Sequence, residues 1–92
     1  MLNNPKTITI YKKFQEEFEI EESAISNAEN LHLELLEKIP FRYESFYLIA
    51  AVCIYATSHM IPKKITFEDI EKISHIKKEE IEKCYNLVLD ME

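Results

Sequence analysis

The most distinctive feature of the hydrophobic pattern is a stretch without formal charge, from Ser45 to His59, in a chain whose residues are 30% charged. Its centre, residues 46–56, is apolar at every position. A half-buried strand would alternate apolar and polar residues, and a surface helix would carry one apolar stripe, whereas a segment apolar on all sides is typical of a buried helix. A membrane span needs about 20 apolar residues, and this run is about half as long. The pattern therefore predicts a central helix with other helices packed around it.

Two amphipathic helices are predicted before this stretch. The first begins after Pro5, with Asn4 or Thr7 as its cap, and its apolar positions recur at helical spacing. They are Ile8, Tyr11, Phe14 and Phe18. The second begins near Ser23, a candidate cap, and ends before Pro40, because a residue that precedes proline is pushed out of the helical region. Its apolar face is formed by Ala24, Ile25, Ala28, Leu31, Leu35, Leu36 and Ile39.

Two further helices are predicted after the central one, which is expected to start at Tyr43 or Glu44 and to end at Pro62. Thr66 precedes the fourth helix, and Asp69, three residues on, completes a pattern close to a capping box. The expected inward-facing residues of this helix are Phe67, Ile70 and Ile73. Ser74 and His75 are expected to form the turn that follows. The apolar face of the longer fifth helix is expected to be formed by Ile76, Ile81, Cys84, Tyr85, Val88 and Leu89. The predicted fold class is all-α, with five helices joined by short links.

The composition restricts the function. The 92 residues suffice for one compact domain, predicted to span residues 1–92, and are too few for two. The chain contains no Gly, which excludes phosphate-binding loops because these need Gly where the backbone approaches a phosphate. No apolar segment follows the N-terminus as in a signal peptide, so a cytoplasmic location is expected.

The residues that could perform chemistry are scattered along the chain. Cys53 and Cys84 lack the spacing of a zinc site or a redox pair, and they are predicted to be buried thiols. His32, His59 and His75 fall in three different elements without metal-ligand spacing, and no nucleophile has a Gly-rich elbow. The sequence therefore predicts a protein that is not an enzyme, with no catalytic residue, no metal site and no cofactor.

Acidic residues are concentrated before the central helix. Residues 16–44 contain nine acidic and two basic residues, in a chain whose net charge is −6. Ile20 is expected to anchor the link between the first two helices. The acidic surface either keeps the chain soluble or binds a basic partner, and the candidate partner-binding residues on it are Glu21, Glu22 and Glu29.

The second half of the chain resembles a known family. The strings AAVCIYATSH and ITFEDIEKISHIKKEEIEKCYNLVL, with Pro62 between them, resemble one cyclin-box repeat from the core domain of transcription factor IIB and archaeal transcription factor B. In that family an alanine-rich third helix precedes a proline-containing loop and two patterned helices. The matching positions here are Ile54, Tyr55, Pro62, Thr66, Phe67, Asp69, Ile70, Ser74, Ile76, Glu80, Ile81, Cys84, Tyr85 and Val88. The resemblance implies a five-helix cyclin-box fold with a central buried helix and a C-terminal helix-turn-helix-like pair.

The resemblance also implies partners. In the family, two such repeats bind the TATA-binding protein and promoter DNA, behind a zinc ribbon that engages RNA polymerase; this chain shows one repeat and no zinc-ribbon cysteines. The candidate DNA-binding residues lie around the last two helices and are Lys63, Lys64, Lys77, Lys78 and Lys83. Glutamates alternate with these lysines at Glu79, Glu80 and Glu82, so the same surface is also interpreted as a solvated face with Lys/Glu pairs.

Three hypotheses follow for a transcription-associated module. The chain binds protein, promoter DNA or both, with the TATA-binding protein and RNA polymerase as expected partners, at the nucleoid if the source is archaeal. Alternatively, it is a cyclin-like adaptor that binds protein without contacting DNA. In the third hypothesis it is an orphan repeat that forms a homodimer through an apolar patch containing Phe41 and Tyr43.

Overall fold

The computed structural model describes residues 5–38, 45–61 and 64–90, with side chains from residue 9 onward. In these ranges the backbone forms five helices and no strand. The helices are α1 (Pro5–Phe18), α2 (Glu22–Leu36), α3 (Phe46–Ser58), α4 (Phe67–Ser74) and α5 (Lys78–Asp90). The predicted all-α, five-helix cyclin-box fold is confirmed.

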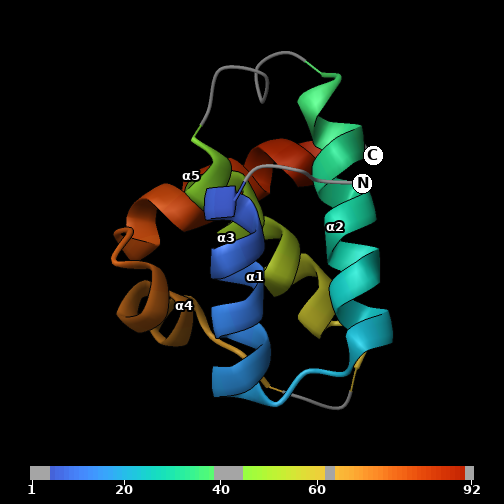
Figure 1. The fold of residues 1–92 in the computed structure, drawn as a ribbon. Helices are drawn as coiled ribbons and strands as arrows, with labels where there is room; N and C mark the ends of the chain where they lie inside the picture. The colour runs from blue at the N-terminus through green and yellow to red at the C-terminus, as the bar shows by residue number, and fades with distance from the viewer. Residues whose placement is uncertain (1–4, 39–44, 62–63, 91–92) are drawn as a thin grey trace.

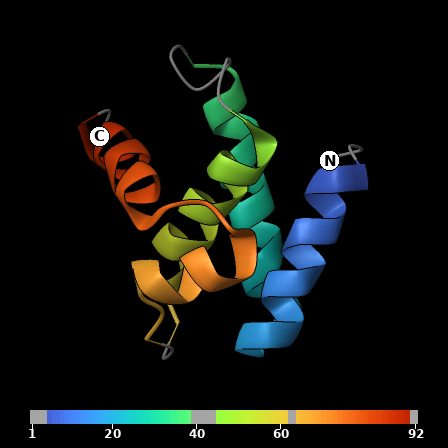
Figure 2. The same cartoon turned by 90° about the vertical axis from the view of Figure 1, so that its left-hand side faces the viewer.

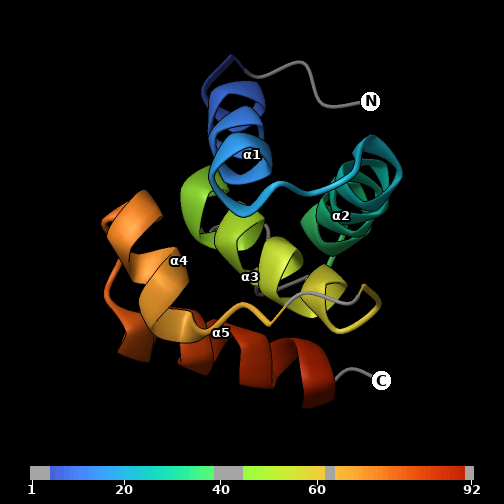
Figure 3. The ribbon, with the colours of Figure 1, turned by 90° about the horizontal axis from the view of Figure 1, so that it is seen from below.

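The uncharged helix α3 lies at the centre of the fold. Each of the other four helices packs against it, and the view from below shows α1, α2, α4 and α5 arranged around its length (Figures 1 and 3). Residues 49–54 are at most 1% exposed. The small side chains of Ala50 and Ala51 allow neighbouring helices to approach α3 closely, and those of Ile49 and Ile54 fill the space between helices. Phe46 and Tyr47 differ from the prediction, since each is 38% exposed; they form the first turn of α3, at the margin of the core.

The helix starts correct three sequence-based expectations. Ser45 caps α3, because its Oγ accepts a hydrogen bond from the Leu48 N–H at 3.0 Å. The helix therefore begins after the predicted start, whose residues lie outside the described ranges, as do Asn4, Ile39, Pro40 and Pro62. Ser23 is not a cap: α2 already begins at Glu22, and the N-cap residue Glu21 makes no side-chain capping bond. Thr7 likewise lies inside α1.

The inner faces of the outer helices match the predicted periodicity in part. Buried core residues that were predicted include Tyr11, Phe14, Ile20, Ala24, Ile25, Ala28, Leu35, Ile70, Ile81, Cys84 and Val88. Ile76 lies before α5 rather than in it, and Leu89 is 49% exposed. The buried part of the apolar stripe of α5 is narrower than expected. This helix packs against α3 and α4, and in Figure 2 its outer side faces away from the other helices.

Candidate functional site

The helix α4 begins with the capping box that the sequence predicts. Thr66 Oγ1 accepts a hydrogen bond from the Asp69 N–H at 3.1 Å, and Asp69 Oδ2 accepts one from the Thr66 N–H at 3.0 Å. These bonds satisfy N–H groups that the first turn of a helix otherwise leaves without a helical partner. The cap fixes the position at which the chain turns into α4.

The turn between α4 and α5 is held by side chains of α4. His75 adopts a left-handed conformation with φ 63°, which few residues other than Gly adopt. Ser74 Oγ accepts a hydrogen bond from the Ile76 N–H at 3.2 Å, and the Glu71 carboxylate accepts one from the Lys78 N–H at 3.0 Å. A carboxylate of α4 therefore caps the start of α5, and the helix-turn-helix-like pair is fixed at its corner.

The lysine nearest the start of α5 is engaged in an ion pair. Lys78 Nζ lies 3.2 Å from Glu68 Oε1, which joins α4 to α5. The hydrogen bond with Glu68 raises the pKa of Lys78. The pKa of Glu68 is lowered, first by hydrogen bonding to its own backbone N–H and then by Lys78. Both side chains are solvent-exposed, so water screens the pair and its contribution to stability is small.

The other candidate DNA-binding lysines are spread over different surfaces. Lys77 is exposed at the N-cap of α5, where its carbonyl accepts the first helical hydrogen bonds. Lys83 lines a depression between α5 and the start of α3, and Lys64 lines another between α3 and α4. Lys63 lies outside the described residues. The described lysines therefore do not form one continuous basic face.

The candidate partner-binding carboxylates lie at the start and in the middle of α2. Glu21 and Glu22 are exposed, whereas Glu29 is half-buried and lines a depression with Tyr11 and Lys12 of α1. Phe41 and Tyr43, the predicted apolar patch, lie outside the described residues.

Aromatic rings gather where α3 ends and α4 and α5 approach it. The ring centroid of Tyr55 lies 4.1 Å from that of Phe67 in a stacked pair and 4.8 Å from that of Tyr85 in a T-shaped pair. The His59 ring lies 4.9 Å from Tyr55 and 6.1 Å from Tyr85. Such pairs stabilise beyond their buried area by about 0.5–1.5 kcal/mol each. The cluster joins three helices around the last turn of α3.

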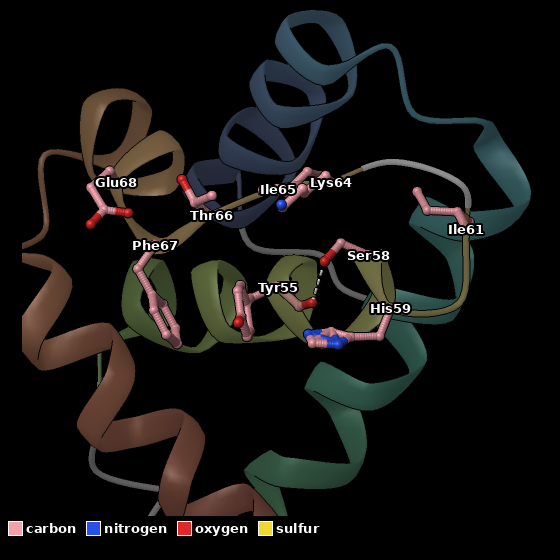
Figure 4. A pocket seen from close by; sticks show the side chains of 9 residues that line it. All are labelled: Tyr55, Ser58, His59, Ile61, Lys64, Ile65, Thr66, Phe67 and Glu68. Carbon is pink, nitrogen blue, oxygen red and sulfur yellow. Dashed lines mark hydrogen bonds between the residues drawn. The ribbon is translucent and has the colours of Figure 1, made fainter.

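One hollow lies on the α4 side of this cluster. It has a volume of about 680 Å³ and lies between the end of α3 and the chain entering α4 (Figure 4). Tyr55, Phe67, His59 and Lys64 are among its lining residues. Ser58 Oγ at its edge donates to the Tyr55 carbonyl at 2.6 Å, so that hydroxyl already has a partner within α3.

A second hollow, the α2–α5 groove, lies on the other side of His59. Its volume is about 460 Å³, and α2, the end of α3 and α5 form its walls. Its lining residues include Leu31, Glu34, Met60, Tyr85, Val88 and Leu89. Met60 is 73% exposed and Leu89 is 49% exposed. His59 lines both hollows, so the end of α3 presents one continuous surface with apolar and aromatic side chains.

Sequence reasoning missed this surface. Tyr55, Phe67 and Tyr85 were assigned to the fold, and Leu89 was expected in the core. Two features of the sequence could have indicated it. Met60 is an apolar residue that follows the polar end of α3, and the apolar stripe of the C-terminal helix α5 is wider than packing against one neighbouring helix requires.

A buried polar pair lies on the opposite side of α3. His32 is 0% exposed, and its Nδ1 lies 2.9 Å from the Tyr11 hydroxyl in a shared hydrogen bond. Burial lowers the pKa of His32 to about 4 and raises that of Tyr11. Burial also raises the pKa of Cys53 to about 12. These groups are therefore held neutral, which suits packing and does not suit acid–base or nucleophilic chemistry at neutral pH.

The described ranges contain no metal-binding cluster of three or more His, Cys, Asp or Glu residues. Cys53 and Cys84 are buried thiols, as predicted, and no disulfide joins them. Among the helices of the described residues, none has both the length and the apolarity to cross a lipid bilayer.

Comparison with known proteins identifies the repeat type. The profile of the transcription factor TFIIB repeat family matches residues 2–91. No curated protein and no solved structure matches the chain.

Proposed function

The chain belongs to the transcription factor TFIIB repeat family, and we propose that it is a transcription-associated module that binds a protein partner through the surface at the end of α3. The match over nearly the whole chain supports the role in transcription. The observation that carries the binding mode is the exposure of Met60 and Leu89 beside the Tyr55 aromatic cluster. Exposed apolar side chains grouped around a groove are typical of protein-binding surfaces.

The charges favour protein over DNA as the primary ligand. Phosphate contacts dominate DNA affinity, and the chain carries a net charge of −6. Lys78 is paired with Glu68, and Lys64 and Lys83 line separate depressions. A partner that itself binds promoter DNA would supply the missing affinity. The TATA-binding protein and RNA polymerase are the proposed partners, which would place the chain at the genomic DNA.

Direct DNA contact is the second candidate function, and the position of Lys77 favours it. This residue is exposed at the start of α5, and the second helix of a helix-turn-helix contacts bases with its N-terminal residues. A mobility shift with promoter DNA that weakens steeply with salt, and further in the variant with Lys77→Glu and Lys78→Glu, would support it. No shift, with or without the TATA-binding protein, would exclude it.

Binding to purified partners tests the main proposal. The immobilised chain is titrated with the TATA-binding protein and, separately, with RNA polymerase, and interferometry measures the affinity. We expect saturable binding of at least one partner that persists at moderate salt, because apolar contacts are less sensitive to salt than phosphate contacts. Absence of binding to both would contradict the proposal.

A further inference from the structure

The α2–α5 groove is open because its two walls make little contact with each other. Both α2 and α5 pack against α3, and the end of α3 forms the floor between them (Figure 3). Leu31 of α2 and Val88 of α5 face this space from opposite sides. The groove therefore lies between two helices that rest on a third.

Two exposed apolar residues line the groove. Met60 follows α3, whose end forms the floor, and is 73% exposed, and Leu89, in the last turn of the α5 wall, is 49% exposed. Tyr85 and Val88 extend the apolar lining inward to the core. A partner helix with apolar side chains at spacings of three and four residues would cover both exposed residues and this floor at once.

The charged side chain that lines the groove is acidic. Glu34 lines it, and no Lys or Arg does so in the part of the chain that the structure describes. Glu34 is exposed, so its carboxylate is accessible to a partner on the α2 wall.

This carboxylate and the net charge of the chain decide between the possible occupants. A second copy of the chain would bring another net charge of −6 to the contact, and an anionic membrane surface would be repelled likewise. A helix with Lys or Arg beside its apolar stripe is complementary to both features of the groove. The site is therefore suited to a protein helix that is basic and amphipathic.

We propose that the α2–α5 groove binds a basic amphipathic helix of a partner protein. Its apolar stripe covers Met60 and Leu89, and a cationic side chain beside that stripe contacts Glu34. This inference rests on the proposed function, because it specifies the partner segment that the surface at the end of α3 accepts.

Two synthetic helical peptides test the proposal. One carries leucines at helical spacing flanked by lysines, and the other has the same leucines flanked by glutamates. Titration of the full chain, followed by fluorescence anisotropy of a labelled peptide, is expected to show at least tenfold tighter binding of the basic peptide. Equal affinity for both peptides, or no binding of the basic one, would overturn the proposal.

Surface variants then locate the peptide. Met60→Asp and Leu89→Asp each replace an exposed side chain, so the fold is retained, and each is expected to weaken binding at least tenfold. Glu34→Lys is expected to weaken it by a similar factor, whereas Glu17→Lys, which changes the net charge equally at an exposed position of α1, is expected to change it less than twofold. Equal weakening by the two charge reversals would show general attraction and refute the site. Unchanged binding in Leu89→Asp would do the same.

The same variants separate this inference from the proposed function. If the chain binds the TATA-binding protein or RNA polymerase and Leu89→Asp leaves that affinity unchanged, the groove is refuted and the function stands. If the basic peptide binds in the groove while neither protein binds the chain, the proposed partners are refuted and the groove stands. A dimer in light scattering that Leu89→Asp converts to a monomer would mean that a second copy occupies the groove.

Discussion

Two histidines lie against tyrosines on different sides of α3, in opposite surroundings. His32 and Tyr11 share a hydrogen bond of 2.9 Å in the core between α1 and α2. His59 and Tyr55 form a T-shaped pair with centroids 4.9 Å apart at the open end of α3. The first imidazole is fully buried, whereas the second lines both hollows on the surface.

The difference contrasts a pair that belongs to the core with a pair at the surface that we propose for recognition. The buried pair has only part of its hydrogen bonding satisfied, because His32 Nε2 has no partner within the described residues. A buried polar group without a partner costs free energy. The hydrogen bond between His32 and Tyr11 must therefore keep its geometry, because its loss would add to this cost. The His59–Tyr55 pair at the open end of α3 depends on no buried hydrogen bond of this kind. The exposed apolar residues near it, Met60 and Leu89, are accessible to a partner.

The same truncation at both histidines tests this contrast and carries the largest expected effect. His32→Ala leaves a cavity in the core and removes the nearer of two hydrogen-bond partners of the Tyr11 hydroxyl, so the free energy of unfolding is expected to fall by about 2–4 kcal/mol. His59→Ala removes ring contacts at the surface and is expected to cost less than about 1 kcal/mol. Urea unfolding measures both. Similar losses at the two positions would contradict the contrast.

The hub role of α3 predicts the next effect. Ala51 is fully buried where neighbouring helices approach α3, and Ala51→Leu is expected to overpack the core and cost about 1–3 kcal/mol. Ser26→Leu adds a leucine at an exposed position of α2 and serves as the control, with little expected change. Thermal unfolding of Ala51→Leu that matches the unaltered chain would mean that α3 is not the hub.

Acid sensitivity is expected to depend on the buried histidine. Burial lowers the pKa of His32 from its ordinary value of 6.5 to about 4. As the pH falls through this interval, the unfolded chain takes up the proton before the folded chain does, so stability is complete above about pH 6.5 and is lost progressively toward pH 4.

The matched variants are His32→Gln and His59→Gln, with the free energy of unfolding measured at several pH values between 7 and 4. We expect the first variant to lose part of the pH dependence and the second to retain it. Parallel curves for His32→Gln and the unaltered chain would show that the buried imidazole does not contribute.

Substitutions at the helix caps are expected to have the smallest effect on the free energy of unfolding. Thr66 Oγ1 and Ser45 Oγ each accept one hydrogen bond, and the Thr66 N–H also donates to Asp69 Oδ2 in a reciprocal bond. Thr66→Ala removes the first bond and weakens the reciprocal one that depends on the same geometry. It is therefore expected to cost about 1 kcal/mol and Ser45→Ala less, within the range of about 0.5–2 kcal/mol for lost caps. A larger loss for Ser45→Ala in urea unfolding would reverse this order.

The fold was predictable because its signals are local or follow from burial. The uncharged stretch predicted α3 as the hub, and Thr66 with Asp69 predicted the start of α4. The surface was not predictable in the same way. Leu89 continues the apolar stripe of α5, and only the packing of that helix on one side shows that this residue is left outside. His32 gave no sequence signal of burial, since its partner Tyr11 lies 21 residues away in another helix.

The most direct test of the account is a map of the partner-binding surface. An isotope-labelled chain is titrated with the TATA-binding protein, or with RNA polymerase if that is the partner bound, and NMR follows each backbone amide. Binding through the end of α3 predicts that the largest changes fall on Met60, Tyr85 and Leu89, while the signals around Tyr11 and His32 stay in place. Changes confined to Lys77 and Lys83, or to the acidic start of α2, would contradict the assignment of recognition to this surface.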